Sequence, residues 1–115
     1  PIENIMLVDE RFKIEDNDII LDKVQILKLG CKCFCQAIAI NGNFPNLWYD
    51  LAYTYNSMVK ISKTEESRKQ MRKLACSSIK KSIMLNGNCW ESWNLYGIIL
   101  SSKGEFFFFF IVVGV

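Results

Sequence analysis

Two stretches of the chain repeat each other at a constant distance of 45 residues. Residues 36–43 end in Asn-Gly-Asn and are followed by Trp48, and residues 81–88 end in the same turn and are followed by Trp93. The offset is the same for the turn and for the tryptophan, so nothing is inserted between them. A fixed period of this size is the sequence signature of stacked repeats. The chain is therefore predicted to fold as an array of similar units rather than around one closed core.

Apolar residues recur at steps of three and four, which is the spacing of an amphipathic helix. Between residues 20 and 40 this stripe consists of Ile20, Val24, Leu27, Cys31, Phe34 and Ile38. Similar patterns predict three further helices, at 45 to about 58, 65–85 and about 89–101. Pro45 suits the first turn of a helix, and Gly42 or a neighbouring Asn is expected to end the first helix in a left-handed conformation. We therefore predict an all-α fold.

Small and large residues occupy matching positions in these helices. A helix that follows a turn carries an aromatic residue and then a large, a small and a second large residue. A helix that precedes a turn carries a small, a large and a small residue. The residues at these positions are Gly30, Phe34, Ala37, Trp48, Leu51, Ala52, Tyr55, Ala75, Ile79, Ser82, Trp93, Tyr96, Gly97 and Leu100. The pattern resembles the tetratricopeptide repeat family, and the resemblance implies antiparallel helix pairs of an α-solenoid, packed together by these residues.

The period is longer than the roughly 34 residues usual in this family, so about eleven extra residues fall in an insert near residues 56–70. A Gly-Cys helix (residues 30–33), a Trp-Tyr-Asp-Leu helix (48–51), this insert and a Trp-Asn-x-x-Gly helix (93–97) follow in that order. The order resembles the large tetratricopeptide scaffold subunits of superkiller complexes, which assist the RNA exosome. The resemblance implies a non-enzymatic protein-interaction scaffold for 3′-to-5′ mRNA decay. It also implies helicase and WD-repeat subunits as partners, and a cytoplasmic or also nuclear location.

Two other functions stay open at this point. One is a tetratricopeptide adaptor of the co-chaperone type, and the other is the repeat portion of a glycosyltransferase-type enzyme. Co-chaperone adaptors usually grip a terminal carboxylate with Lys, Arg and Asn side chains, whereas the corresponding helix faces here show Asp50, Asn56 and Asn94 with little positive charge. This chemistry argues mildly against the adaptor. The residues do not exclude a catalytic domain elsewhere in a longer parent protein.

The chain has no histidine and five cysteines. The lack of histidine excludes Ser-His-Asp and Cys-His nucleophiles and every metal site that contains histidine. An odd number of cysteines without a secretory signal argues against a disulfide framework and favours reduced thiols. On a helix, Cys31 and Cys35 share one face while Cys33 points away, so we interpret them as core residues. We predict no catalytic residue, no cofactor and no metal.

The charges are unevenly distributed although the net charge is only +2. Residues 1–22 hold seven of the twelve acidic residues, and residues 60–81 hold eight of the fourteen basic residues. We interpret the basic run as a solvated face. The alternative is direct contact with RNA phosphates, through a patch of Lys60, Lys63, Arg68, Lys69, Arg72 and Lys73. Aromatic residues off the predicted core face, Tyr49, Tyr53 and Trp90, are expected to pack against a neighbouring repeat or remain exposed, with base stacking as the alternative.

The predicted organisation has three parts. Residues 1–19 are an acidic divergent segment or linker, residues 20–104 hold the repeats, and residues 105–115 form a hydrophobic tail outside the repeat pattern. We interpret the tail, which contains five consecutive phenylalanines, as translated non-coding sequence or a faulty gene model. A short membrane-associating tail is the alternative, although the apolar run 106–113 is shorter than the roughly 18 residues that span a bilayer. Because the chain begins with Pro1, we also expect a fragment.

Overall fold

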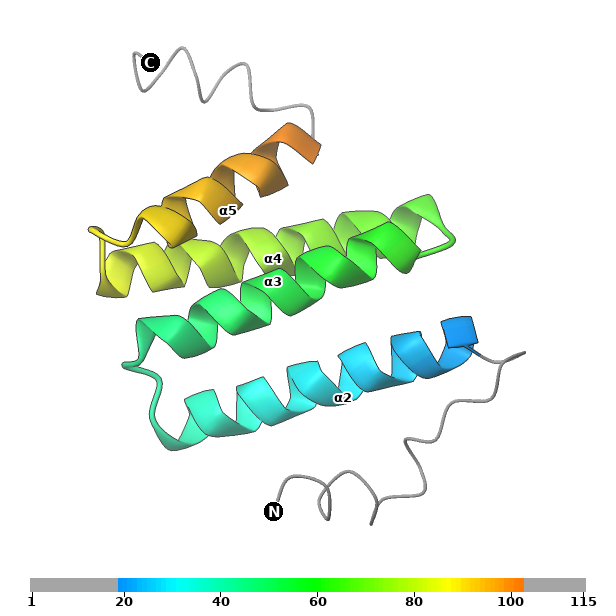
Figure 1. Cartoon of the computed structure of the whole chain (residues 1–115), viewed down its shortest axis with the longest axis horizontal. Coiled ribbons are helices and arrows are strands. Elements are labelled where there is room, and N and C mark those ends of the chain that lie inside the picture. Colours follow the sequence, from blue (N-terminus) through cyan, green and yellow to red (C-terminus); the bar gives the residue numbers. More distant parts are fainter. Residues whose placement is uncertain (1–18, 103–115) are drawn as a thin grey trace.

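The computed structural model describes residues 19–102, and within them it contains four helices and no strand. The helices are α2 (Ile19–Ile40), α3 (Pro45–Ile61), α4 (Glu65–Leu85) and α5 (Trp90–Ser102). Each helix runs antiparallel to the one before it and packs beside it, with α3 and α4 in the middle of the stack (Figure 1). The predicted all-α fold of antiparallel helix pairs is confirmed.

The two turns that contain Asn-Gly-Asn are built in the same way. In the first turn, the backbone N–H of Asn43 donates to Oδ1 of Asn41 at 3.1 Å, and Nε1 of Trp48 donates to the carbonyl oxygen of Gly42 at 2.8 Å. The second turn has the same two bonds, at the same lengths, between the residues that lie 45 positions later. The sequence repeat is therefore also a repeat of hydrogen bonds.

The glycines of these turns differ from the prediction. Neither Gly42 nor Gly87 has the positive φ that favours glycine, so neither is in the left-handed conformation. The Asn41 side chain helps to close the first turn by accepting a hydrogen bond from the Asn43 N–H, and the alternative of a left-handed asparagine stays a prediction. A Cβ atom on Gly42 would lie 3.3 Å from the carbonyl oxygen of Ile38, so the small residue serves close packing.

The apolar residues form two clusters rather than one core. The first joins α3, α4 and α5 and consists of Ala52, Ala75, Cys76, Ile79, Leu95 and Ile99. The second joins α2 and α3 through Cys31, Leu51 and Met58, with partly buried residues around them. Tyr55 packs against both clusters. Each helix is thus held mainly by its sequence neighbours, as in a solenoid.

The segment near residues 56–70, predicted to be an insert, is mostly helical. Helix α3 continues beyond the predicted end near Met58 to Ile61, and α4 begins at Glu65 as predicted. Thr64 caps α4 by accepting a hydrogen bond from the backbone N–H of Ser67 at 3.1 Å, as is usual for a residue at this position. The extra residues therefore lengthen two adjacent helices instead of forming a long loop.

Two predicted segments lie outside the described residues. These are the acidic segment 1–19, apart from Ile19 itself, and the hydrophobic tail 105–115. Residues 103 and 104, predicted to end the repeats, also lie outside. The boundaries of the three predicted parts therefore stay predictions.

Candidate interaction surfaces

The residues predicted to pack the repeats are found mostly at helix contacts. Ala52, Ala75 and Ile79 have no exposed surface, and Ser82 and Leu51 are almost fully buried. Phe34, Trp48 and Tyr55 are half-buried around the second cluster, and Ala37 is also half-buried. Gly30 has more room than expected, because a Cβ atom there would lie 4.0 Å from Cγ2 of Thr54, an ordinary contact distance.

The last helix differs from the expectation at its tryptophan. Trp93 was predicted to lie in the repeat core with Tyr96 and Leu100, but 43% of Trp93 is exposed, while Leu100 is buried. The Trp93 ring lies against Tyr96 of the same helix, with 6.4 Å between the ring centroids, and its indole N–H is held by the turn. The buried face of α5 is made by Ser92, Leu95, Ile99 and Leu100 instead. Gly97, also predicted to pack there, is half-buried.

A buried pair of serines links three helices, and no spacing in the sequence predicts this link. The hydroxyl of Ser82 donates to the carbonyl oxygen of Pro45 at 2.9 Å and lies 3.0 Å from the hydroxyl of Ser92. Because Ser82 has only one proton to donate, Ser92 must be the donor in the serine pair. The start of α3, the end of α4 and the start of α5 are thereby fixed together. The only sequence signal was that Ser82 stands where the first repeat has Ala37.

Of the cysteines of α2 that were interpreted as core residues, Cys31 is buried against α3, as expected, but Cys35 is exposed, so the core interpretation is wrong for Cys35. The Cys31 thiol is buried and lies 3.7 Å from Sδ of Met58, and Sγ of Cys35 lies 4.0 Å from the Tyr55 hydroxyl. Cys33 is exposed. Burial, followed by the effect of Cys35, raises the pKa of Cys31, and the same two causes raise the pKa of Tyr55 to about 12. Within residues 19–102 no group of His, Cys, Asp and Glu is arranged to hold a metal ion.

The predicted basic patch is divided by local ion pairs. Arg68 and Arg72 both bind the Glu65 carboxylate, at 3.0 and 2.8 Å, and Arg68 also donates to the carbonyl oxygen of Ser62. Hydrogen bonds from Arg72 and then Arg68 lower the pKa of Glu65. The two arginines therefore stabilise the turn between α3 and α4. The remaining members of the patch, Lys60, Lys63, Lys69 and Lys73, are exposed.

Aromatic residues off the predicted core face form part of the surface of α3 and α5. Tyr53 and Trp90 are 58% and 72% exposed, whereas Tyr49 is half-buried against the first cluster. The Tyr49 and Tyr53 rings are stacked, with 6.5 Å between their centroids. Glu91 of α5 is among the groups that raise the pKa of Tyr49, after burial and Tyr53. Tyr49 therefore belongs to the packing of the first cluster, whereas Tyr53 and Trp90 lie on the surface.

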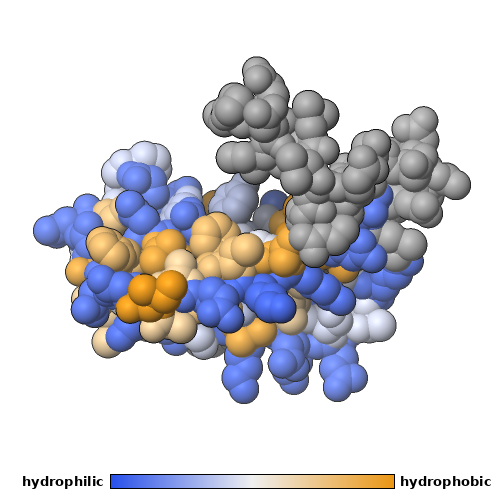
Figure 2. Space-filling view, turned by 90° about the horizontal axis from the view of Figure 1, so that it is seen from below, coloured by the Kyte–Doolittle hydropathy of each residue, from blue (hydrophilic) through white to orange (hydrophobic). Residues whose placement is uncertain are grey.

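The outer surface of α2 combines hydrophilic and hydrophobic residues. Ile26, Leu29 and Ile40 are exposed on this helix, and the view from its side shows hydrophobic residues between hydrophilic ones (Figure 2). In a stacked array such residues are available for the next helix. None of the helices between residues 19 and 102 is both long and apolar enough to cross a membrane.

Comparison with known proteins places these helices in context. The chain is similar to tetratricopeptide repeat protein 37 of Xenopus laevis, with 32% identity over an alignment of 95 residues that covers 78% of this chain. This similarity supports a place in the tetratricopeptide repeat family. The chain spans 6% of the length of that relative. No family model and no solved structure matches the chain. In terms of this repeat, α3 and α4 correspond to one helix pair, with α2 packed on α3 and α5 packed mainly on α4.

Proposed function

We propose that the chain is part of a protein-interaction scaffold of a superkiller-type complex, which supports 3′-to-5′ mRNA decay by the RNA exosome. The single observation that carries the scaffold role is the similarity to a tetratricopeptide repeat protein across most of this chain. Stacked helix pairs present extended surfaces and are used widely to hold protein partners. The superkiller assignment rests on the order of the Gly-Cys, Trp-Tyr-Asp-Leu and Trp-Asn-x-x-Gly helices and on the extra residues that lengthen α3 and α4.

The proposed partners are an RNA helicase and WD-repeat subunits, and the proposed location is the cytoplasm, with the nucleus as a second site. The chain itself is proposed to have no enzymatic activity and no cofactor. Direct RNA contact is the weaker possibility, because Glu65 forms ion pairs with Arg68 and Arg72 and offsets one of their two positive charges. The scaffold is therefore proposed to act on RNA decay through its protein partners.

Affinity purification of the tagged chain from a cell lysate, followed by quantitative mass spectrometry, tests the proposal. The expected result is enrichment of an RNA helicase and a WD-repeat protein that survives nuclease treatment. A matched variant, Tyr53→Ala with Trp90→Ala, changes exposed rings without disturbing the clusters and identifies whether this surface takes part. Enrichment of chaperones through their carboxyl-terminal tails would instead establish an adaptor of the co-chaperone type. If the purified chain brings with it no helicase and no exosome-linked protein, the superkiller assignment is rejected.

A further inference from the structure

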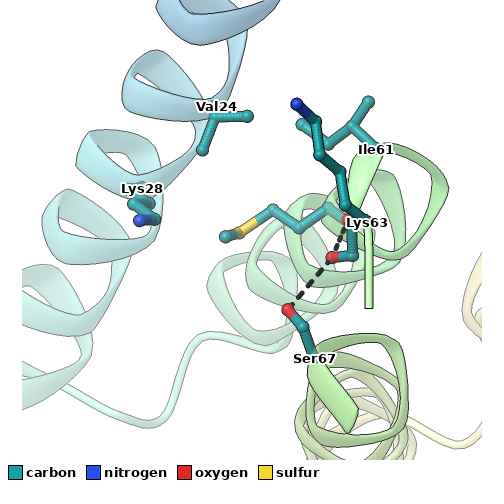
Figure 3. A pocket seen from close by; sticks show the side chains of 7 residues that line it. Val24, Lys28, Ile61, Lys63 and Ser67 are labelled. Atoms are coloured by element: carbon teal, nitrogen blue, oxygen red, sulfur yellow. Dashed lines mark hydrogen bonds between the residues drawn. The ribbon is translucent and has the colours of Figure 1, made fainter. Parts of the chain in front are cut away.

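A cavity of about 390 Å³ lies between the amino-terminal half of α2 and the turn that joins α3 to α4. In Figure 3, Val24 and Lys28 project from α2 on one side, and Ile61, Lys63 and Ser67 lie on the other. The complete lining is Val24, Lys28, Met58, Ile61, Ser62, Lys63 and Ser67. This volume lies toward the lower end of the roughly 300–1,000 Å³ of typical ligand sites, so it suits one or two side chains rather than a large cofactor.

The cavity combines an apolar lining with two positive charges. Val24, Met58 and Ile61 supply the apolar part, and Lys28 and Lys63 are exposed lysines beside it. The ion pairs of the nearby turn leave these lysines available, because Glu65 binds Arg68 and Arg72. Among the described residues, neither lysine has an ion-pair partner. A ligand that fits both properties carries an apolar group next to an anion.

The serine hydroxyls in the lining are already engaged. The Ser62 hydroxyl donates to the carbonyl oxygen of Met58 at 2.7 Å, and the Ser67 hydroxyl donates to Oγ of Ser62 at 3.3 Å. These bonds hold the turn in shape and leave the lysines as the main polar groups for a ligand. Lysine recognises anions as a flexible point charge, which suits carboxylates presented at varying positions along a peptide.

The cavity is formed largely by residues that lengthen the helix pair. Five of the seven lining residues lie in the segment 56–70, which exceeds the usual repeat, and only Val24 and Lys28 come from outside it. Here α3 and α4 extend past the apolar clusters, while the start of α2 approaches them from the other side. The cavity is thus a consequence of the extra length and not a surface that every such repeat has.

We propose that this cavity binds a short acidic peptide segment of a partner protein, with one apolar side chain inserted among Val24, Met58 and Ile61. Carboxylates on either side of that side chain face Lys28 and Lys63. A free phosphate or a nucleic-acid backbone would use the lysines but would leave the apolar lining exposed to water. The inference names a docking site for the proposed scaffold and therefore rests on that function.

Fluorescence anisotropy with the full chain tests the inference. The probe is a fluorescein-labelled synthetic peptide in which Leu and Phe alternate with Glu and Asp. Saturable binding is expected, and the combined change Lys28→Glu with Lys63→Glu should weaken it by at least about tenfold. Val24→Phe, which narrows the cavity without changing charge, should weaken binding to a similar degree. Peptides with Ser in place of Leu and Phe, or Lys in place of Glu and Asp, should not compete.

A second charge reversal provides the matched control. Lys73→Glu with Lys80→Glu makes the same change in net charge at exposed lysines outside the lining, so peptide affinity should be preserved. If both double variants weaken peptide binding equally, the binding comes from general charge attraction, and the proposal is overturned. Displacement of the peptide by single-stranded RNA with equal loss in both variants would also overturn it. Circular dichroism confirms that each variant keeps its helices.

Three further outcomes separate this inference from its rivals. Binding that appears only after Glu15, Asp16 and Asp18 are changed to their amides would show that the chain's own acidic segment occupies the cavity, which would overturn the role of a partner. If helicase and WD-repeat subunits co-purify with both the unchanged chain and the Lys28→Glu, Lys63→Glu variant while no peptide binds, the cavity inference fails and the scaffold function stands. If the peptide binds as expected but those subunits do not co-purify, the cavity inference stands and the superkiller assignment fails.

Discussion

Small residues define how closely the central helices approach each other. Ala52 of α3 and Ala75 of α4 lie in the same cluster, and both are completely buried. Ile79 of α4 and Ile99 of α5 are packed in the same cluster. Interiors of this kind are close-packed, so even a few added carbon atoms must displace a neighbour. The geometry of the α3–α4 pair is therefore set by the size of individual side chains.

Replacing Ala52 with Leu should destabilise the chain by about 1–3 kcal/mol, because the added atoms overpack a site with no free surface. Ala39→Leu makes the same change at an exposed position on α2 and should have little effect. Urea denaturation followed by circular dichroism compares the two variants with the unchanged chain. Equal midpoints for all three proteins would contradict the packing of α3 against α4 at Ala52.

Ionisation of the Tyr55 phenol is expected to lower the stability of the fold at alkaline pH. Burial and the nearby Cys35 raise its pKa from 10.0 to about 12, so the unfolded chain loses this proton at lower pH than the folded chain. Because the folded state then holds the proton more tightly, the stabilising contribution is complete below pH 10 and is lost as the pH rises toward 12. Tyr55→Phe should reduce this loss of stability, measured as the urea denaturation midpoint between pH 10 and pH 12. If Tyr55→Phe leaves the pH dependence of stability unchanged, ionisation of Tyr55 is not the cause of that dependence.

The first residues of helices α3 and α4 are determined by residues that are adjacent in the sequence. Pro45 begins α3 and Glu65 begins α4, and both starts were predictable because the proline and the capping Thr64 act within one helical turn. The depth of Trp93 was not predictable in this way, because its equivalent Trp48 has the same local sequence pattern but is half-buried beside α2. The serine link from Ser82 to α5 depends on three helices at once, so no local spacing reveals it.

The cavity could not be predicted from the sequence either. A longer period indicated about eleven extra residues relative to the usual repeat, but not whether they form a loop or continue the helices. The structure shows that α3 continues to Ile61 and that Lys28 of α2 lies across from Lys63. Lys63 belonged to the predicted basic patch, whereas Lys28 is distant from it in sequence. Sequence patterns therefore located the elements but not the pairing of surfaces from separate helices.

The two equivalent tryptophans offer a comparison between elements. Both indole N–H groups donate to a glycine carbonyl at 2.8 Å, but only Trp48 also packs in an apolar cluster. Trp93→Phe should cost about 0.5–1.5 kcal/mol for the lost hydrogen bond. Trp48→Phe should cost more, because it also removes buried apolar surface between α2 and α3. Urea midpoints measured on the two single variants test this order, and a larger effect at Trp93 would contradict it.

At the scale of the whole molecule, stability should be distributed as in a stacked array. Helix α2 packs on α3, and α5 packs mainly on α4, whereas α3 and α4 each have neighbours on both sides. Apolar residues stay exposed on the outer helices, including Ile26 on α2 and Ile98 on α5. The similar protein is much longer than this chain, which agrees with an array that continues in that protein. A helix with one neighbour can open without the rest of the stack.

Hydrogen exchange measured by mass spectrometry should therefore show backbone amides of α3 and α4 exchanging at least roughly tenfold more slowly than those of α2 and α5. Two matched variants make the test specific. Leu51→Ala weakens the cluster that holds α2, and Ile99→Ala weakens the cluster that holds α5. The first should speed exchange mainly in α2 and the second mainly in α5, because each helix depends on its nearest neighbours. If either variant speeds exchange equally in all four described helices, the chain unfolds as one cooperative unit and the stacked-array description of its stability is wrong.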